Sequence, residues 1–436
     1  MNVAQFRDAY LIGIKGAGMT ALATILRERG VRVSGSDTSE QFPTDAVLAA
    51  RHIPVIGGFA AANVPARVDV VIRSTAYGEE HVEVRRARAL GHAVHTYPEV
   101  VAALFNAGKG IAVCGSHGKS TTTALLGFVL AAGGSDPTVM VGAVVPQFDG
   151  NARVGQSELI VLEADEYQNK LAQYRPFGVV LTNIDYDHPD FFPTPESYVE
   201  AFRAFVRRIP SEGFLVACTD DPLVAEVVRD ARCVVLPYGR SRGIPEDLHP
   251  QLVGAHNIEN ALGVLTAAMH LGISRATALA AIAAFTGTRR RFEVVGELAG
   301  ITVIDDYAHH PTEIRATLAA ARARYPGRRV LCVFHAHTFT RTIALREAFA
   351  SCFHDADQVA IMDIFGSVRE AHGGITAEEL AASISAPPRA TATGGVDTTI
   401  AALAHDVRAG DVVICVGAGE NDRVARGIVA AISACG

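Results

Sequence analysis

With 436 residues, 49% of them hydrophobic, the chain is too long for one ordinary core, so we expect two or three domains. Its net charge is −7, and it shows no uncharged apolar run of about 18 residues, no signal-peptide pattern and no long basic stripe, which argues against a membrane span, secretion and nucleic acid. The seven cysteines are scattered without a C-x-x-C pair, which is typical of reduced thiols in a cytoplasmic protein.

Apolar runs of strand length alternate with helical stretches along most of the chain. This pattern is typical of α/β domains with mainly parallel sheets. Each of three blocks opens with an apolar strand, and we place the blocks at 1–107, 108–293 and 294–436. We expect Rossmann-like first and third domains and a P-loop-type central domain. Strands of the first block are predicted at 10–14, 31–34 and 68–72.

The first strand runs into a glycine turn, Gly16-Ala-Gly18-Met-Thr-Ala21, which fits G-x-G-x-x-A. Glycines let a backbone approach a pyrophosphate, and the following helix offers free N–H groups at its N-terminus. The next strand ends on Asp37, about 20 residues on, where an acid can bind a ribose hydroxyl. A close-packing turn and a helix-capping Asp37 are the alternatives. A dinucleotide oxidoreductase is the rival function.

A second glycine turn opens the central block and reads Gly115-Ser-His-Gly118-Lys119-Ser120-Thr121. It resembles a P-loop, although Val113 stands where the common pattern has its first glycine. Its backbone N–H groups can cradle phosphates, Lys119 can reach the terminal phosphates, and the Ser120 hydroxyl can ligate Mg²⁺. The alternative is that these residues form an ordinary helix start without a phosphate-binding role. Hydride transfer does not require a loop of this kind, so the turn argues against an oxidoreductase.

Two later strands of the central block end in polar clusters. LIVLEADEY supplies Glu163, Asp165 and Glu166, and VVLTNIDYDHPD supplies Asp185, Asp187 and His188. Ligands of a parallel sheet bind beyond the carboxyl ends of its strands. A carboxylate and a neutral imidazole near a triphosphate are plausible Mg²⁺ ligands. A single strand-end acid is more often a cap, but two clusters after one P-loop favour a metal site.

Polar residues also mark a later helix and the second block boundary. HNIENA opens a helix with Asn257 and Asn260 three residues apart on one face, where they could bind an adenine edge or simply cap the helix. Arg291, before Phe292, and Asp306, before Tyr307, flank the boundary at 293. Charged residues at a domain seam can close over a nucleotide or solvate a linker.

These motifs occur together in a fixed order: GSHGKSTTT, EADEY, TNIDYDHPDFF, HNIENA, RRRFE, DDYAHHPTEI, HTFTRT and DIFGSVRE. In this the chain resembles the Mur ligase family, and GIKGAGMTALA and SGSD resemble that family's UDP-binding domain. The resemblance covers nearly the whole chain. It implies a cytoplasmic ligase of peptidoglycan precursor synthesis, working as a monomer or homodimer. It would use ATP and Mg²⁺ to couple L-alanine to the carboxylate of UDP-N-acetylmuramate through an acyl phosphate. A related ligase adding another amino acid or a peptide is the alternative.

The resemblance also implies roles for individual residues. It assigns phosphate binding to the glycine turn and Lys119, and Mg²⁺ to Ser120, Glu163 and His188. It assigns ATP to a set from four motifs: Gly115, Gly118, Lys119, Ser120, Thr121, His256, Asn257, Asn260, Arg291 and Asp306. The UDP sugar would be held by Gly16, Gly18, Asp37 and Ser74, and the muramyl carboxylate and incoming amino acid by His309, His337 and Arg341.

The chain departs from the family pattern in two places. Only 16 residues separate Gly239 from His256, where relatives usually carry additional strands, so we expect a tight surface connection at 240–255. EADEY is followed by QNKLAQY in place of a basic-aromatic run, in a stretch that we expect to border the muramyl group.

A carboxylate becomes a useful acyl donor only when its oxygen can leave. Transfer of the γ-phosphoryl group of ATP achieves this, with Lys119, Mg²⁺ and Arg291 offsetting the developing charge. The neutral amine of alanine then attacks, with His309 or a water as the candidate proton acceptor, although His309 could equally cap or pack a helix. A scaffold that only bound nucleotide would be expected to lose part of the set Lys119, Glu163 and His188, yet all three are present. Substrates divided among three domains imply closure of the third domain on the second.

Overall fold

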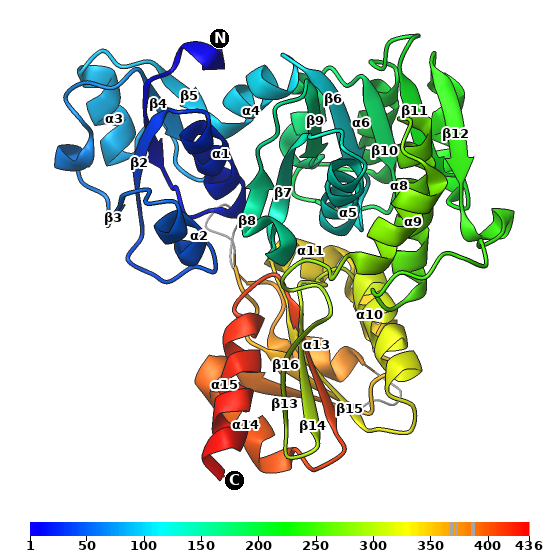
Figure 1. Cartoon of the computed structure of the whole chain (residues 1–436). Coiled ribbons are helices and arrows are strands. Elements are labelled where there is room, and N and C mark those ends of the chain that lie inside the picture. The colour runs from blue at the N-terminus through cyan, green and yellow to red at the C-terminus, as the bar shows by residue number, and fades with distance from the viewer. Residues whose placement is uncertain (367–369, 371–372, 385–388, 436) are drawn as a thin grey trace. The chain divides into compact units, whose positions relative to one another are not determined.

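The computed structural model describes residues 1–366, 370, 373–384 and 389–435. The chain divides into two compact units. The first holds Met1–Asp185, Val199–Gln251 and Glu259–Thr288, and the second holds Tyr186–Tyr198, Leu252–Ile258 and the chain from Arg289 onward. Over the described residues the strands form three sheets, two in the first unit and one in the second (Figure 1). The expected fold class, α/β with mainly parallel sheets, is confirmed.

The first sheet has the strand order β3-β2-β1-β4-β5, and its neighbouring strands are parallel. Its strands are β1 (Asp8–Ile12), β2 (Arg32–Asp37), β3 (Val55–Gly57), β4 (Val70–Arg73) and β5 (Val94–Thr96), and its helices are α1 (Ala17–Glu28), α2 (Asp45–Ala50), α3 (Val82–Ala89) and α4 (Tyr97–Phe105). Strand β1 ends earlier than predicted because Gly13, at φ +81°, already belongs to the glycine turn. Strand β2 ends on Asp37, as predicted from the position of this acid after the glycine turn.

The second sheet has the order β12-β11-β10-β6-β9-β7-β8, with β8 antiparallel to β7 and the other pairs parallel. Its strands are β6 (Lys109–Cys114), β7 (Thr138–Val145), β8 (Gly150–Arg153), β9 (Leu159–Glu163), β10 (Gly178–Leu181), β11 (Phe214–Cys218) and β12 (Val234–Tyr238). The helices along this stretch of chain are α5 (Lys119–Ala132), α6 (Pro195–Val206), α7 (Pro222–Val227), α8 (Ala255–His270) and α9 (Arg275–Ala284).

Helix α1 of the first sheet packs against β7 and β8 at one end of the second sheet. The Arg51 guanidinium donates a hydrogen bond to the Asp149 carbonyl at 2.9 Å, and the Asn151 amide donates one to the Ala17 carbonyl. The side chain of Asn151 is fully buried, although β8 is the last strand of its sheet. The first two sheets therefore share one packed interior.

The third sheet has the order β13-β14-β18-β15-β16-β17, with β13 antiparallel to β14 and the other pairs parallel. Its strands are β13 (Glu293–Leu298), β14 (Ile301–Asp306), β15 (Val330–His335), β16 (Gln358–Met362), β17 (Arg389–Gly394) and β18 (Val412–Gly417). Its helices are α10 (Pro311–Arg324), α11 (Phe339–Ala344), α12 (Arg346–Ser351), α13 (Ala377–Ser383), α14 (Val396–Asp406) and α15 (Asn421–Cys435).

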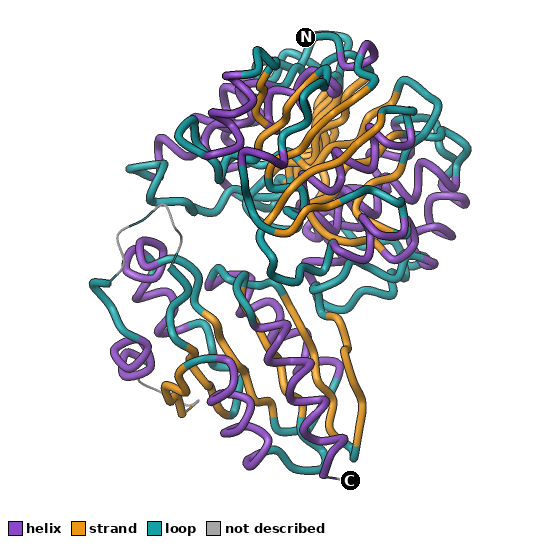
Figure 2. Tube along the Cα trace, turned by 90° about the vertical axis from the view of Figure 1, so that its left-hand side faces the viewer, coloured by secondary structure: helices purple, strands orange, loops and turns teal. Residues whose placement is uncertain are grey.

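Both faces of the third sheet are buried, which explains why its strands are apolar throughout. Cys332 and Phe334 of β15 lie in a core with α10, α12 and α13, whereas Leu331 and Val333 lie in a second core with α14 and α15. Figure 2 shows helices flanking the strands of this unit. Polar side chains lie instead at the carboxyl ends of the strands.

Short 3-10 helices occupy several connections: η1 (Val3–Gln5), η2 (Ala61–Asn63), η3 (Pro146–Phe148), η4 (Tyr167–Gln173), η5 (Val228–Asp230) and η6 (Arg240–Arg242). The segment after β12 is exposed over 240–244 and is anchored by the buried side chain of Leu248. The predicted surface connection at 240–255 is confirmed. None of the helices in the described part of the chain has the length and apolar character needed to cross a bilayer.

Candidate active site

The second glycine turn joins β6 to α5 and needs both of its glycines. Gly115 has φ +131°, and a Cβ there would lie 2.1 Å from the Thr182 hydroxyl. Gly118 has φ +79°, and a Cβ there would lie 2.7 Å from the Asn260 side-chain oxygen. Backbone geometry and close neighbours therefore both exclude a side chain at these positions. The first helical residue of α5 is Lys119.

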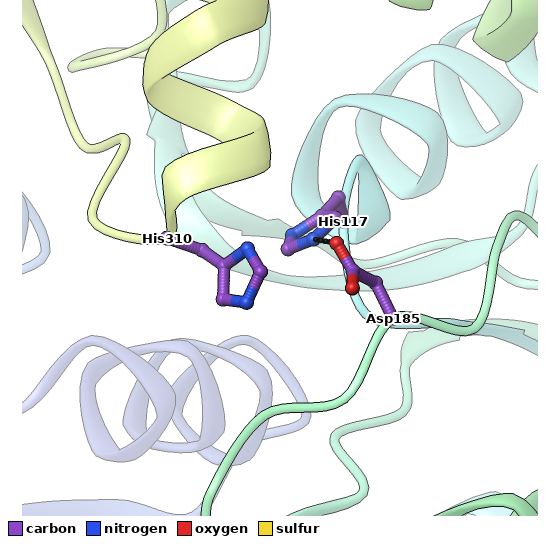
Figure 3. A group of neighbouring side chains, drawn as sticks. All are labelled: His117, Asp185 and His310. Carbon is purple, nitrogen blue, oxygen red and sulfur yellow. Dashed lines mark hydrogen bonds and ion pairs between the residues drawn. The ribbon is translucent and has the colours of Figure 1, made fainter. Parts of the chain in front are cut away.

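Hydrogen bonds fasten this turn to the residues after β10. The Ser116 hydroxyl donates to the Asp185 carbonyl and accepts from the Asp185 N–H, each at 2.8 Å. The His117 N–H donates to the Asn183 side-chain oxygen at 2.8 Å, and the Thr182 hydroxyl donates to the His117 carbonyl at 2.7 Å. The His117 ring faces the Asp185 carboxylate, with Nε2 and Oδ2 3.1 Å apart (Figure 3). The loop is thus held rigid from the neighbouring strand.

Lys119 bends back over the turn. Its Nζ donates hydrogen bonds to the carbonyls of Gly115 at 2.6 Å and Ser116 at 2.9 Å, and to the Glu166 carboxylate at 3.0 Å. Burial alone lowers the pKa of Lys119, but the negative charges of Glu166 and Asp165 outweigh burial and raise it. The lysine is therefore a fixed positive charge at the mouth of the loop.

Hard oxygen atoms gather beside the lysine, as an Mg²⁺ site requires. The Ser120 hydroxyl donates to Glu163 Oε1 at 2.8 Å, and Glu163 Oε2 accepts from the Gly142 N–H at 2.5 Å. Glu163 is the last residue of β9, which pairs with β6, the strand that leads into the second glycine turn. A hydroxyl and a carboxylate of this kind are ligands that Mg²⁺ prefers, so the residues present fit the ion.

The first glycine turn lies against Tyr97, the first residue of α4. A Cβ on Gly18 would lie 2.6 Å from the Tyr97 hydroxyl oxygen, so the backbone and the phenol are in direct contact. Gly16 is the N-cap of α1, and a Cβ there would meet only the Gly13 carbonyl at 3.7 Å. Ser74 follows β4, and its N–H donates to the Ile12 carbonyl at 2.9 Å. Gly16, Gly18 and Ser74 therefore lie at the carboxyl edge of the first sheet.

Asp37 is buried beneath the same turn. Its carboxylate accepts from the Lys15 N–H at 2.7 Å and from the Thr38 N–H at 2.8 Å. Burial, the largest influence, raises the pKa of Asp37 against these hydrogen bonds. Asp37 thus fastens the turn to the end of β2, a role that the sequence did not suggest, and its contact with a ribose stays a prediction.

In the second unit, Arg341 of α11 pairs with Asp187. Arg341 Nε lies 2.7 Å from Asp187 Oδ1, and Nη2 lies 3.3 Å from Oδ2. The two side chains are 6% and 7% exposed, so the pair is buried. Burial raises the pKa of Asp187, but the Arg341 charge outweighs it and holds that pKa well below its usual range. His188 follows at φ +57°, and its N–H donates to Asp187 at 2.7 Å.

The seam residues of this unit surround Tyr307. Asp306 accepts from the N–H groups of Phe292 at 2.8 Å and Ala308 at 2.7 Å. The Arg291 guanidinium lies 5.2 Å from the centre of the Tyr307 ring and 3.7 Å from the Glu313 carboxylate. Asp306 therefore orders the backbone on both sides of Tyr307, and Arg291 is held over its face.

Two histidines of this unit are neutral. Burial lowers the pKa of His309 to about 3 although Glu313, 3.3 Å away, acts in the opposite direction. Burial also lowers the pKa of His337 to about 4, and its ring stacks on Phe365 with centroids 5.5 Å apart. A neutral His309 can accept a proton, but a pKa of about 3 makes it a weak base.

The asparagines of α8 have local partners. The Asn257 amide donates to the Val253 carbonyl at 2.7 Å, and His256 lies under Gly254, whose Cβ would be 2.7 Å from the His256 ring. An N-cap side chain accepts a hydrogen bond, so this donated bond ties Asn257 to the preceding residues without making it a cap. Asn260 lies against Gly118 of the second glycine turn. Contact of either with adenine stays a prediction. Of the motif DIFGSVRE, residues 367–369 lie outside the described part of the chain.

Sequence reasoning named Glu166 and Asp187 but gave neither a partner, because an acid after a strand carries no sign of what it faces. It missed Tyr97, His117 and Asn183 as parts of the site. His117 lies inside the loop motif, so its place could have been expected. Tyr97 stands in no motif, and only the packing of α4 against the first glycine turn reveals it.

Three family models match the chain. They are described as "Mur ligase family, catalytic domain" over residues 8–137, "Mur ligase middle domain" over 113–251 and "Mur ligase, glutamate ligase domain" over 290–419. Together they span most of the chain, and their order follows the three sheets.

Full-length relatives agree with the models. A UDP-N-acetylmuramate–L-alanine ligase of Desulfitobacterium hafniense is 38% identical, covering 96% of this chain and 99% of the relative. One of Sorangium cellulosum is also 38% identical, covering 99% and 97%. The crystal structure of UDP-N-acetylmuramate-alanine ligase from Thermotoga maritima matches with a TM-score of 0.82 at 25% identity, covering 98% of this chain and 100% of that one. A murein peptide ligase of Psychrobacter arcticus shares the fold, with a TM-score of 0.75 at 23% identity.

Proposed function

The chain belongs to the Mur ligase family, and from this premise we propose that it couples L-alanine to UDP-N-acetylmuramate with hydrolysis of ATP. It is a ligase of peptidoglycan precursor synthesis that works through an acyl phosphate. The observation that carries this assignment is the full-length likeness to relatives of that activity, joined to a phosphate loop whose lysine, hydroxyl and carboxylate are all in place.

The first step activates the muramyl carboxylate. A carboxylate oxygen attacks the γ-phosphorus of ATP, the bond to the β,γ-bridging oxygen breaks, and ADP leaves. The backbone N–H groups of the loop would hold the phosphates, and Lys119 would offset charge on the transferred group. We assign Ser120, Glu163 and His188 to Mg²⁺, which when bound supplies further positive charge to the phosphates.

The second step forms the amide. The amine of alanine attacks the acyl carbon, phosphate leaves, and the amine nitrogen loses a proton. Arg291 and Asp306 are assigned to ATP, and His309, His337 and Arg341 to the acyl and amino-acid end. His309 is the proposed proton acceptor, and its neutral state fits that role, although its low pKa makes a water molecule the competing acceptor.

The UDP half of the substrate is assigned to the first sheet. The glycine turn with Gly16 and Gly18 would receive the diphosphate, because free N–H groups of α1 point from that edge. Asp37 would support the turn and Ser74 would lie beside it. We further propose domain boundaries at 1–107, 108–293 and 294–436, a cytoplasmic location, and a monomer or homodimer.

Phosphate release is the direct test. The protein is supplied with ATP, Mg²⁺, UDP-N-acetylmuramate and each amino acid in turn. L-alanine is expected to give the highest kcat/KM, with glycine and serine as slow substrates, because one methylene contributes only about 1–3 kcal/mol of discrimination. Faster release with glutamate or a peptide would leave the family standing and refute the named substrate. Absence of ATP-dependent release with every acceptor would refute the ligase assignment.

A further inference from the structure

The ammonium of Lys119 has no hydrogen-bond donor left for a nucleotide. An ammonium offers three N–H donors. Each finds an acceptor within the chain: the Gly115 carbonyl at 2.6 Å, the Ser116 carbonyl at 2.9 Å and the Glu166 carboxylate at 3.0 Å. A phosphate oxygen can therefore reach the lysine only if one of these acceptors is given up.

Glu166 is the acceptor that a phosphate can replace. The two carbonyls belong to the loop itself, whereas Glu166 comes from the turn after β9 and brings a negative charge like that of a phosphate. Its side chain is 1% exposed, and its Coulomb interaction with Lys119 is the strongest influence that raises the pKa of this lysine. Without a carboxylate here, the empty loop would hold a poorly compensated buried cation, which is costly.

Glu166 and a bound triphosphate cannot share the lysine without strain. Both are anionic, and contact with the same ammonium would bring their oxygens close to each other while Asp165 adds a further charge to that side. At contact distance such repulsion is strong in a partly buried site, because the effective dielectric constant is low there. Either Glu166 or the triphosphate must therefore move away from the Lys119 ammonium.

We propose that Glu166 holds Lys119 in the nucleotide-free enzyme and releases it to the phosphates of ATP, so that Glu166 sets the nucleotide affinity. It is a positioning residue, because it acts through Lys119. The inference rests on the proposed function, which places ATP at this loop. Each binding event exchanges one charge-assisted hydrogen bond for another, and this exchange weakens nucleotide binding and favours release of ADP.

The test uses Glu166→Gln, which keeps the side-chain shape and one acceptor oxygen but removes the charge. Calorimetric titration of the full-length protein with MgATP should give a dissociation constant at least about threefold lower than that of the parent, since a charge-assisted bond is worth more than a neutral one. The KM for the UDP substrate should stay within twofold. An unchanged or higher ATP dissociation constant would overturn the proposal.

The chain contains a matched control pair on the same two strands. Lys109 at the start of β6 and Glu158 just before β9 form an ion pair of 2.7 Å, with side chains 51% and 64% exposed. Glu158→Gln removes the same charge from the opposite ends of these strands. Its ATP dissociation constant should match that of the parent, and an equal gain in this variant would overturn the proposal.

A second variant separates action through the lysine from plain repulsion of ATP. In a Lys119→Met background, Glu166→Gln should no longer tighten ATP binding. If the gain persists, Glu166 acts only by its charge and the proposal fails. A crystal structure of the parent with a non-hydrolysable ATP analogue gives an independent reading. Lys119 Nζ and Glu166 should be beyond hydrogen-bond distance there, and a retained contact would contradict the exchange. Failure of the parent protein itself to bind ATP would instead refute the proposed function.

Discussion

Arg341 and Asp187, 154 residues apart in the sequence, form a two-bond ion pair from which solvent is almost excluded. This ion pair limits how Arg341 can bind the carboxylate of an incoming amino acid. Its Nε and Nη2 are committed to Asp187, and Nη1 donates to the His337 carbonyl at 3.2 Å. A carboxylate of an incoming amino acid would therefore meet an arginine that is already held in one orientation.

Arg341→Ala should destabilise the protein by about 3–5 kcal/mol, because it leaves Asp187 as a buried charge without its partner. The KM for alanine should also rise much more than the KM for ATP. Chemical denaturation and steady-state kinetics measure the two effects. Arg423→Ala, at an exposed pair with Glu420, is the control and should alter neither quantity. A variant as stable as the parent would show that the pair does not persist in solution.

Lys119→Ala should lower kcat by about 10²-fold or more, because it removes a positive charge from the transferred phosphate. Its thermal midpoint should fall as well, because the buried Glu166 carboxylate loses the lysine charge that compensates it. Lys109→Ala, at the other end of β6, is the matched control and should retain the activity of the parent. Ligase activity of Lys119→Ala within a few-fold of the parent would refute the phosphate-loop assignment.

Glu163→Gln should raise the Mg²⁺ concentration needed for half-maximal activity. The amide oxygen can still accept from the Gly142 N–H, and the amide NH2 can donate to the Ser120 hydroxyl, so the local fold is preserved, but the charge that attracts the cation is lost. A Mg²⁺ titration of initial rates measures this. His188→Ala should shift the same titration in the same direction. If both variants titrate like the parent, the metal ligands lie elsewhere.

The free energy of unfolding should fall as the pH is lowered from about 6.5, because His309 is neutral in the fold with a pKa of about 3 and becomes protonated on unfolding. Its stabilising contribution is complete above the unfolded pKa and decreases as the pH falls toward the folded pKa, by at most about 1.4 kcal/mol per pH unit. His309→Gln should flatten this dependence in urea titrations between about pH 5 and 7. His354→Gln, at an exposed histidine, is the control. An unchanged slope for His309→Gln would show that His309 is already charged in the folded protein.

Gly18→Ala should raise the KM for the UDP substrate at least several-fold, because the new Cβ would lie 2.6 Å from the Tyr97 hydroxyl and displace either the turn or α4. Gly78→Ala, where a Cβ would meet no atom within 4 Å, is the control. Addition of Tyr97→Ala to Gly18→Ala should restore part of the affinity. Wild-type kinetics for Gly18→Ala alone would contradict the close contact.

The sequence was most informative where structure depends on local chemistry. Glycine turns after strands, helix starts and the alternation of strands and helices follow from neighbouring residues, so both turns and the fold class could be predicted. The pairing of Lys119 with Glu166 and that of Arg341 with Asp187 depend on which strand ends meet, and one chain gives no direct sign of that. At Asp37 the motif position predicts a ribose ligand. The structure adds that the Asp37 carboxylate accepts two backbone hydrogen bonds, which the motif did not indicate.

The packing of α1 on β8 has a consequence for the integrity of the molecule. A terminal strand of a sheet exposes unpaired backbone groups and invites pairing with other chains. Here β8 is such a strand, yet its residues Gly150, Asn151 and Ala152 are buried beneath the helix that also begins at the first glycine turn. The first sheet, to which we assign the UDP half of the substrate, thus also contributes the helix that covers a strand prone to pairing with other chains. Removal of residues 1–107 would expose β8 to solvent. A fragment that holds only the central block should therefore aggregate under conditions in which the whole protein does not.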